Sequence, residues 1–198
     1  MTPLLKISNL YVNFQVRKSK FSAVKNFNLL IEKNQIVGLV GESGSGKSVT
    51  AMSIIRLLQE PKASYGEKSS IEFDGEEILS ANKKSLRKIR GNKISMIFQE
   101  PMTSLNPYHK VGDQIVESIL LHKKQYKHDA ILEAKNLMSL VEIPDVDRRF
   151  DSYPHELSGG QRQRIMIAMA LANKPKLLIA DEPTTALDVT IQAQILDL

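Results

Sequence analysis

Residues 36–58, IVGLVGESGSGKSVTAMSIIRLL, decide the fold of this 198-residue chain. Residues 36–40 are an apolar run, which predicts one strand buried on both faces. The glycine-rich segment 41–48 follows, and the pattern of residues 49–58 predicts a helix. A strand, a G-x-x-x-x-G-K-S loop and a helix in this order are typical of a phosphate-binding loop.

The residue types of this loop suit it to binding phosphate. Gly41, Gly44 and Gly46 permit left-handed backbone conformations, so that successive N–H groups point at one anion. The helix that follows directs its positive dipole end to the same place. Lys47 adds a charge that reaches the outer phosphates, and the Ser48 hydroxyl is a ligand for Mg2+. A chance glycine-rich turn is the alternative, but the flanking segments favour binding of a nucleoside triphosphate.

The composition is that of an ordinary globular domain. Apolar residues make up 42% of the chain and charged residues 25%. The sequence has no Cys, which excludes disulfides and thiolate metal sites. The N-terminal residues show no signal-peptide pattern, and no apolar run is long enough to cross a bilayer. Any link to a membrane is therefore expected to go through a partner.

The net charge of +5 is concentrated in two basic segments. One is residues 83–90, and the other contains Lys123, Lys124 and Lys127. Tyr126 is the only aromatic residue between these charges that could stack on a base, so solvated helix faces are favoured over a nucleic-acid site. The sequence predicts no nucleic-acid partner.

The order of the predicted elements indicates an α/β fold. Strands at Leu5–Val16 and 21–31 are expected to form a small antiparallel sheet, and residues 70–75 form a strand that runs into an Asp-Gly turn. Buried strands at 93–98 and 176–180 join the strand at 36–40 in a parallel sheet. Amphipathic helices at 111–122 and 129–141 form an insertion, and a further helix covers 161–172.

Three polar side chains follow the two later core strands. Asp181 matches the Walker B position, which holds Mg2+, and Glu182 is placed to orient and deprotonate an attacking water. A helix cap is the alternative for this acidic pair. Gln99 is placed to contact Mg2+ or the water, although an amide after a strand is more often a surface group. Ligands gather at the carboxyl ends of parallel strands, so these residues and the phosphate loop are expected to converge.

A second anion cradle is predicted at residues 157–161, LSGGQ. Ser158 stands at a helix N-cap position, and two glycines expose the backbone beside the helix N-terminus. An ordinary capped helix start is the alternative. One triphosphate hardly fills two separate cradles, so the second cradle needs an explanation of its own.

Together, residues 41–48, Gln99, residues 157–161, residues 177–182 and residues 186–188 resemble the ATP-binding subunit of an ABC transporter, in the usual order and spacing over essentially the whole chain. The resemblance implies a P-loop NTPase core with a parallel sheet, an N-terminal antiparallel β-subdomain and an inserted α-helical subdomain. It implies one ABC ATPase domain over 1–198, with the core at 1–100 and 157–198 and the helical subdomain at 101–156.

The resemblance also implies the site residues and a head-to-tail dimer, in which each cradle is half of a composite ATP site. Glu182 and Gln99 are the expected catalytic residues, and Ser48, Gln99 and Asp181 the expected Mg2+ ligands. Phe14, a core aromatic on spacing alone, becomes a base-stacking ring. The expected ATP-binding residues are Phe14, Gly41, Glu42, Ser43, Gly44, Ser45, Gly46, Lys47, Ser48, Val49, Ser158, Gly159, Gly160, Gln161 and Asp188.

Segments 98–107, 153–160 and 180–190 are similar to the oligopeptide and dipeptide import branch, which includes nickel and glutathione importers. The implied function is an ATPase that energises a peptide importer from the cytoplasmic face of the membrane. The implied partners are a homologous or identical ATPase subunit, transmembrane permease subunits and, indirectly, an extracytoplasmic solute-binding protein. A nickel or glutathione importer ATPase and a soluble ABC ATPase are the alternatives.

The family's switch-loop histidine, on a strand beyond residue 188, has no counterpart in this sequence. We therefore expect a truncated chain that binds ATP without efficient turnover.

Overall fold

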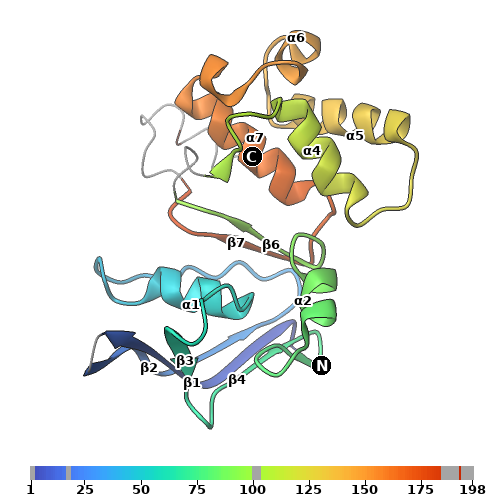
Figure 1. The fold of residues 1–198 in the computed structure, drawn as a ribbon. Coiled ribbons are helices and arrows are strands. Elements are labelled where there is room, and N and C mark those ends of the chain that lie inside the picture. Colours follow the sequence, from blue (N-terminus) through green and yellow to red (C-terminus); the bar gives the residue numbers. More distant parts are fainter. Residues whose placement is uncertain (1–2, 17–18, 100–103, 184–191, 193–198) are drawn as a thin grey trace. The chain divides into compact units, whose positions relative to one another are not determined.

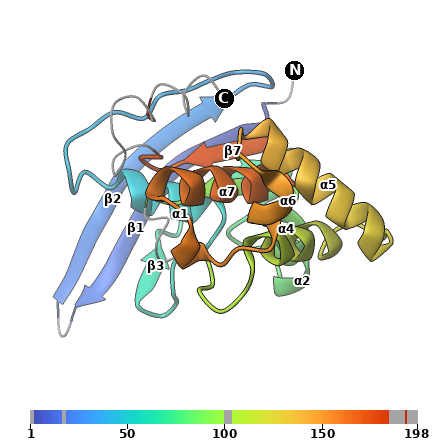
Figure 2. The ribbon, with the colours of Figure 1, turned by 90° about the horizontal axis from the view of Figure 1, so that it is seen from above.

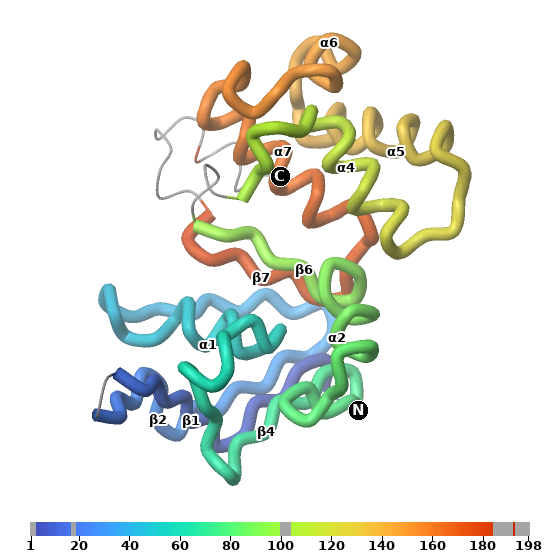
Figure 3. Tube along the Cα trace, in the orientation of Figure 1, coloured from blue at the N-terminus to red at the C-terminus, as the bar shows by residue number. Residues whose placement is uncertain are grey.

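The computed structural model describes residues 3–16, 19–99, 104–183 and 192. They belong to two compact units, Met1–Arg87 and Lys88–Leu198. Figure 1 labels the helices and strands, and Figure 3 follows the path of the chain through each unit.

The first unit is built on an antiparallel sheet with the order β2-β1-β4-β5. β1 (Leu5–Val16) and β2 (Ser19–Ile31) form the long hairpin that the alternating pattern predicts. The other edge of β1 pairs with β3 (Ala63–Tyr65) and with β4 (Ser70–Phe73). β4 turns at Asp74 and Gly75, both with positive φ, into β5 (Glu76–Glu77), as the Asp-Gly pair predicts.

A β-bulge explains why the alternation along β1 is loose. Ile7 and Leu10 are both buried although they are three residues apart. The pairing with β2 shifts register between them, and Asn9 has φ 48°. The extra residue returns the next apolar side chain to the core face of the sheet. Sequence reasoning missed β3 and β5, because two- and three-residue strands carry little periodicity.

The predicted strand at residues 36–40 is wrong for this structure. Among the described residues of the first unit, none pairs with this segment, and Ile36 and Val40 are 100% and 93% exposed. A parallel strand obtains its hydrogen bonds and its burial from neighbouring strands on both sides. An apolar run indicates a preference for a buried strand, but it does not supply the neighbouring strands. The observed helix is also shorter than predicted, because α1 covers only Lys47–Ile54.

The second unit contains a parallel pair of strands, β6 (Ile94–Ile97) and β7 (Leu177–Ala180). Figures 1 and 2 show α7 (Gly159–Leu171) lying over these strands. α4 (Val111–Leu120), α5 (Lys127–Leu140) and α6 (Val146–Phe150) complete the unit, with a 3-10 turn at Pro154–Glu156. The basic segment 83–90 forms α2 (Lys83–Ile89), which ends at the start of this unit.

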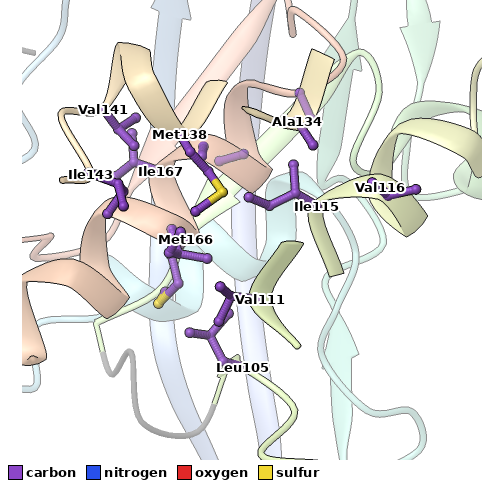
Figure 4. Close-up of a cluster of buried hydrophobic side chains, with 14 of the residues drawn as sticks. Leu105, Val111, Ile115, Val116, Ala134, Met138, Val141, Ile143, Met166 and Ile167 are labelled. Atoms are coloured by element: carbon purple, nitrogen blue, oxygen red, sulfur yellow. The ribbon is translucent and has the colours of Figure 1, made fainter. Parts of the chain in front are cut away.

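One apolar core holds α4, α5 and α7 together (Figure 4). Ile115, Ala134, Met138 and Ile165 are fully buried in it. These residues lie on the faces that the 3.6-residue periodicity predicts. The two helices expected at 111–122 and 129–141 are therefore present as α4 and α5, and α6 is an element that was too short to predict.

Lys123 departs from the prediction of a solvated basic face. Its ammonium donates to the Glu133 carboxylate at 2.6 Å and to the Ala172 carbonyl at 2.9 Å. The Glu133 carboxylate also accepts a hydrogen bond from Gln125. Lys123 follows α4, and its ammonium joins Glu133 of α5 to the residue after α7, because an ammonium group can donate to more than one acceptor.

Candidate functional site

The phosphate loop of the first unit has the expected left-handed backbone at Gly44 and Gly46 but not at Gly41. Gly44 and Gly46 have φ of 78° and 94°, and the amide of Ser45 donates to the Glu42 carbonyl at 3.2 Å. Gly46 is the N-cap of α1 and has no side chain to cap it. The first N–H groups of α1 therefore lack a capping side chain and are suited to an anion.

Position 46 also requires a glycine because β2 lies close to its Cα atom. A Cβ atom at this position would lie 2.7 Å from the Ala23 carbonyl oxygen and 3.2 Å from a methyl carbon of Val24, both on β2. A Cβ on Gly44 would meet no atom within 4 Å. The loop is thus anchored on β2 at Gly46 and open at Gly44.

The Lys47 ammonium lies across the loop. It donates to the carbonyls of Gly41 and Glu42 at 2.8 and 3.1 Å. A cavity of about 260 Å³ lies between the loop and β2, lined by Ala23, Val24, Phe27, Gly41, Ser45 and Lys47, among others. A larger cavity of about 620 Å³, between Arg56 and Ser80, contains none of the predicted site residues.

These residues fit a magnesium nucleotide. The loop offers backbone donors, a helix N-terminus and one ammonium to the phosphates. Within the described ranges, no three His, Cys, Asp or Glu side chains cluster as a metal site. Mg2+ beside phosphates is usually bound through one or two protein groups, with waters and phosphate oxygens as the other ligands. Ser48, which is half-buried in the first turn of α1, offers such a hydroxyl.

The second unit brings Gln99 and Glu182 together. The Gln99 side-chain amide donates to a Glu182 carboxylate oxygen at 2.8 Å, although 83 residues separate them. The parallel pairing of β6 with β7 explains the contact, because both residues follow the carboxyl ends of these strands. Convergence of the phosphate loop with this pair stays a prediction.

The chain turns sharply at the end of β7. The Asp181 amide still donates to the Ile97 carbonyl at 3.0 Å, which extends the ladder by one bond. Glu182 then adopts φ 46°, a left-handed conformation that a residue with a Cβ atom rarely takes. Strained backbone of this kind often occurs at functional sites.

The segment 157–161 forms a capped helix start. The Ser158 hydroxyl accepts from the Gln161 amide at 3.2 Å, and the Gln161 side-chain oxygen accepts from the Ser158 amide at 3.2 Å. This capping box opens α7. A Cβ on Gly159 would meet no atom within 4 Å, so the turn is open on that side. The structure therefore contains the predicted cap, while anion binding here stays a prediction.

Two predicted residues remain apart from these contacts. Phe14 lies on β1, half-buried, opposite Phe21 of β2 and Ala63 of β3. Asp188 lies outside the described residues.

One polar contact at the end of β7 was not predicted. Gln163, on α7 and only 1% exposed, donates its side-chain amide to the Pro183 carbonyl at 2.7 Å. Gln163 precedes the buried Ile167 by four residues, so helical spacing alone places it on the inward face. A polar residue at an inward position is the signal that would have identified it.

Comparison with known proteins identifies the family. The family model for ABC transporters matches residues 24–185. A dimeric structure of MJ0796, a bacterial ABC transporter cassette, is 28% identical, covers 98% of this chain and 80% of its own, and has a TM-score of 0.85. The cbiO1 protein of Clostridium perfringens, part of the ABC transporter complex cbiONQ, is 25% identical over the whole chain and 72% of its own, with a TM-score of 0.77.

Sequence relatives are closer. The oligopeptide transport ATP-binding protein OppD of Haemophilus influenzae is 51% identical over 100% of this chain and 60% of its own length. OppD of Bacillus subtilis is 48% identical over 100% of this chain and 55% of its own. The chain thus spans less than two thirds of these relatives.

The comparisons also confirm the predicted fold class. The MJ0796 and cbiO1 structures share the P-loop ABC ATPase fold, with an antiparallel N-terminal sheet, a parallel sheet and helices. In the part of the chain that the structure describes, no helix is long and apolar enough to span a membrane. The family match, the relatives and the fold lead to one conclusion: this chain belongs to the ABC transporter family.

Proposed function

We propose that this chain binds and hydrolyses ATP to energise a peptide importer. The observation that carries the proposal is the Gln99–Glu182 contact at the carboxyl ends of two parallel strands. A carboxylate held there by an amide is placed to orient a water and accept its proton. The names of the relatives supply the transported class, since both OppD proteins are oligopeptide transport ATP-binding proteins.

The phosphate loop is proposed to bind the triphosphate. The backbone N–H groups of residues 41–49 are the donors, and the Lys47 ammonium turns from the loop carbonyls to the outer phosphate oxygens. Ser48, Asp181 and Gln99 are the proposed Mg2+ contacts, and bound Mg2+ would neutralise charge on the phosphates. Phe14 is proposed to stack on the base.

Glu182 is proposed to be the general base. Its carboxylate would take a proton from water as the oxygen attacks the γ-phosphorus, while the bond to the leaving phosphate breaks. Gln99 would orient the carboxylate through the observed amide contact, or the water directly.

The composite site is proposed to need two subunits. Residues 158–161 of one subunit would cover the triphosphate that is bound at residues 41–48 of the other, with Asp188 in the segment between the two sites. The MJ0796 cassette was solved as a dimer, in one case bound to ADP and Pi, which supports this assembly. Transmembrane permease subunits, an extracytoplasmic binding protein and a position at the cytoplasmic face complete the proposal.

The variant Glu182→Gln tests this function in the full-length protein. It keeps the size of the side chain but removes the base, so turnover should fall by a hundredfold or more while the ATP dissociation constant stays the same. The variant Lys47→Ala should weaken ATP binding itself. Wild-type turnover in the first variant would remove Glu182 from the role of base.

A second measurement tests the transported class. The full-length protein, reconstituted with its permease subunits in vesicles, should import oligopeptides only with ATP. ATP-dependent uptake of nickel or glutathione, and not of peptides, would overturn the peptide assignment while leaving the ATPase assignment intact.

A further inference from the structure

The turn after β7 has an unfavourable backbone conformation that needs support from neighbouring residues. Glu182 has φ 46°, and Pro183 follows it. A left-handed conformation is unfavourable for a residue with a Cβ atom, and a following proline restricts that residue further. Such a turn persists only where the surrounding structure determines it.

Two amides hold this turn from different sides. Gln99 donates to the Glu182 carboxylate at 2.8 Å. Gln163 donates to the Pro183 carbonyl, one residue later, at the short distance of 2.7 Å. The first contact fixes the side chain of Glu182, and the second fixes the backbone that carries it.

Gln163 is well placed to determine the backbone. It is 1% exposed, and Ile165 and Ile167, two and four residues later, are also buried. A buried amide without a partner is costly, whereas an apolar side chain of similar size would pack here without that penalty. The hydrogen bond to Pro183 is the reason that a glutamine is tolerated at this position.

The same helix begins at the second predicted cradle. α7 opens with the capping box of Ser158 and Gln161, and Gln163 follows in the next turn. A helix moves largely as one rigid element, so a displacement of its first turn shifts the donor that holds the Pro183 carbonyl. Figures 1 and 2 show α7 lying over β6 and β7, and β7 ends just before this turn.

We propose that Gln163 is a positioning residue for hydrolysis. Its hydrogen bond holds the left-handed turn that orients the Glu182 carboxylate, and it links that turn to the first turn of α7. The inference rests on the proposed function, in which Glu182 is the base. In this role Gln163 acts through the turn that carries Glu182, and not by binding the nucleotide itself.

The test is the variant Gln163→Leu in the full-length protein. Leucine places an apolar side chain of similar size in the core and removes the donor, so the turn relaxes and the carboxylate moves. Misplacement of a reacting group by about 1 Å can cost on the order of a hundredfold in rate. We expect kcat to fall about tenfold, and the ATP dissociation constant to remain unchanged because residues 41–48 are untouched.

Asn173→Leu is the matched control. Asn173 is 8% exposed, lies just beyond the other end of α7, and donates to the carbonyls of Gly91 and Ser118, both at 2.9 Å. Asn173→Leu removes a buried amide, as Gln163→Leu does, but it leaves the hydrogen bonds of the Glu182–Pro183 turn intact. Both variants should lower Tm, and only Gln163→Leu should lower kcat. Equal losses of kcat, or none in Gln163→Leu, would show that Gln163 serves stability alone.

A double-mutant cycle with Glu182→Gln separates the two proposals. If Gln163 acts through Glu182, then adding Gln163→Leu to Glu182→Gln causes no further loss in single-turnover hydrolysis. Multiplying losses would overturn the role of Gln163 but not that of Glu182. Full turnover in Glu182→Gln alone would overturn both. Gln163→Met, whose flexible side chain packs more easily, replaces leucine if that variant does not fold.

Discussion

The contact between the phosphate loop and β2 gives the sharpest prediction, through the variant Gly46→Ala. Two penalties act at this position. A left-handed φ of 94° costs a residue with a Cβ atom about 1–2 kcal/mol. The new methyl would also lie 2.7 Å from the Ala23 carbonyl oxygen, and the strain of such overpacking costs about 1–3 kcal/mol.

The two penalties add to about 2–5 kcal/mol of unfolding free energy for Gly46→Ala. Gly44→Ala is the matched control, because Gly44 has φ 78° but open space around its Cβ position. It should lose only about 1–2 kcal/mol. Gly38→Ala, with open space and no positive φ, should change stability by about 0.5 kcal/mol or less.

The assay is urea denaturation of the three full-length variants, followed by circular dichroism, with no nucleotide present. Nucleotide is left out because binding to the folded state would mask the differences. If Gly46→Ala is no less stable than Gly44→Ala, then β2 does not constrain the loop. That result would refute the close approach to Ala23 as a cause of destabilisation.

Three further predictions concern the second unit. Ser158→Ala removes the hydroxyl of the capping box and should cost about 1 kcal/mol in urea denaturation, whereas Ser158→Thr should retain most of it. Gly112→Ala places a methyl 2.5 Å from two ring carbons of Phe150 and should cost about 1–3 kcal/mol, with part of the loss relieved in a Phe150→Leu background. Burial acts to raise the pKa of Glu133, but the hydrogen bonds from Lys123 and Gln125 outweigh it and lower the pKa below the usual 4.5. A carboxyl whose pKa is lowered in the folded state stabilises the protein above pH 4.5, and this contribution is lost as the pH falls through the folded-state pKa. Glu133→Gln should therefore destabilise most at pH 7 and progressively less as the pH is lowered below 4.5.

Each of these has a contradicting result. Unchanged urea midpoints for Ser158→Ala would mean that the cap is not formed in solution. A stable Gly112→Ala would show that α4 and α6 do not approach so closely. If the loss of stability in Glu133→Gln is the same at pH 7 and at pH 3.5, then the charge of the Glu133 carboxylate is not its cause.

Much of the site was predictable because short-range chemistry decides it. Left-handed conformations at Gly44 and Gly46 follow from the loop motif, and the structure has both. The capping box at Ser158 follows from a serine three residues before a glutamine. The partition into a core at 1–100 and 157–198 and a helical subdomain at 101–156 stays a prediction.

The failures have a common physical cause in long-range partners. The apolar run at 36–40 was expected to form a buried strand, but a strand exists only where another strand pairs with it. Lys123 was expected on a solvated face, but its ammonium finds Glu133 and Ala172, the latter 49 residues away. Spacing along the chain does not encode such distances.

By itself, the sequence determined the phosphate loop, the amphipathic faces of α4, α5 and α7, and the two carboxylates after β7, because each depends on neighbours within a few residues. Only the tertiary structure decided that Gln99 donates a hydrogen bond to Glu182, that Gln163 donates one to Pro183, and that Gly46 lies close to Ala23. These contacts join residues 20 or more positions apart, and their positions follow from strand pairing and helix packing.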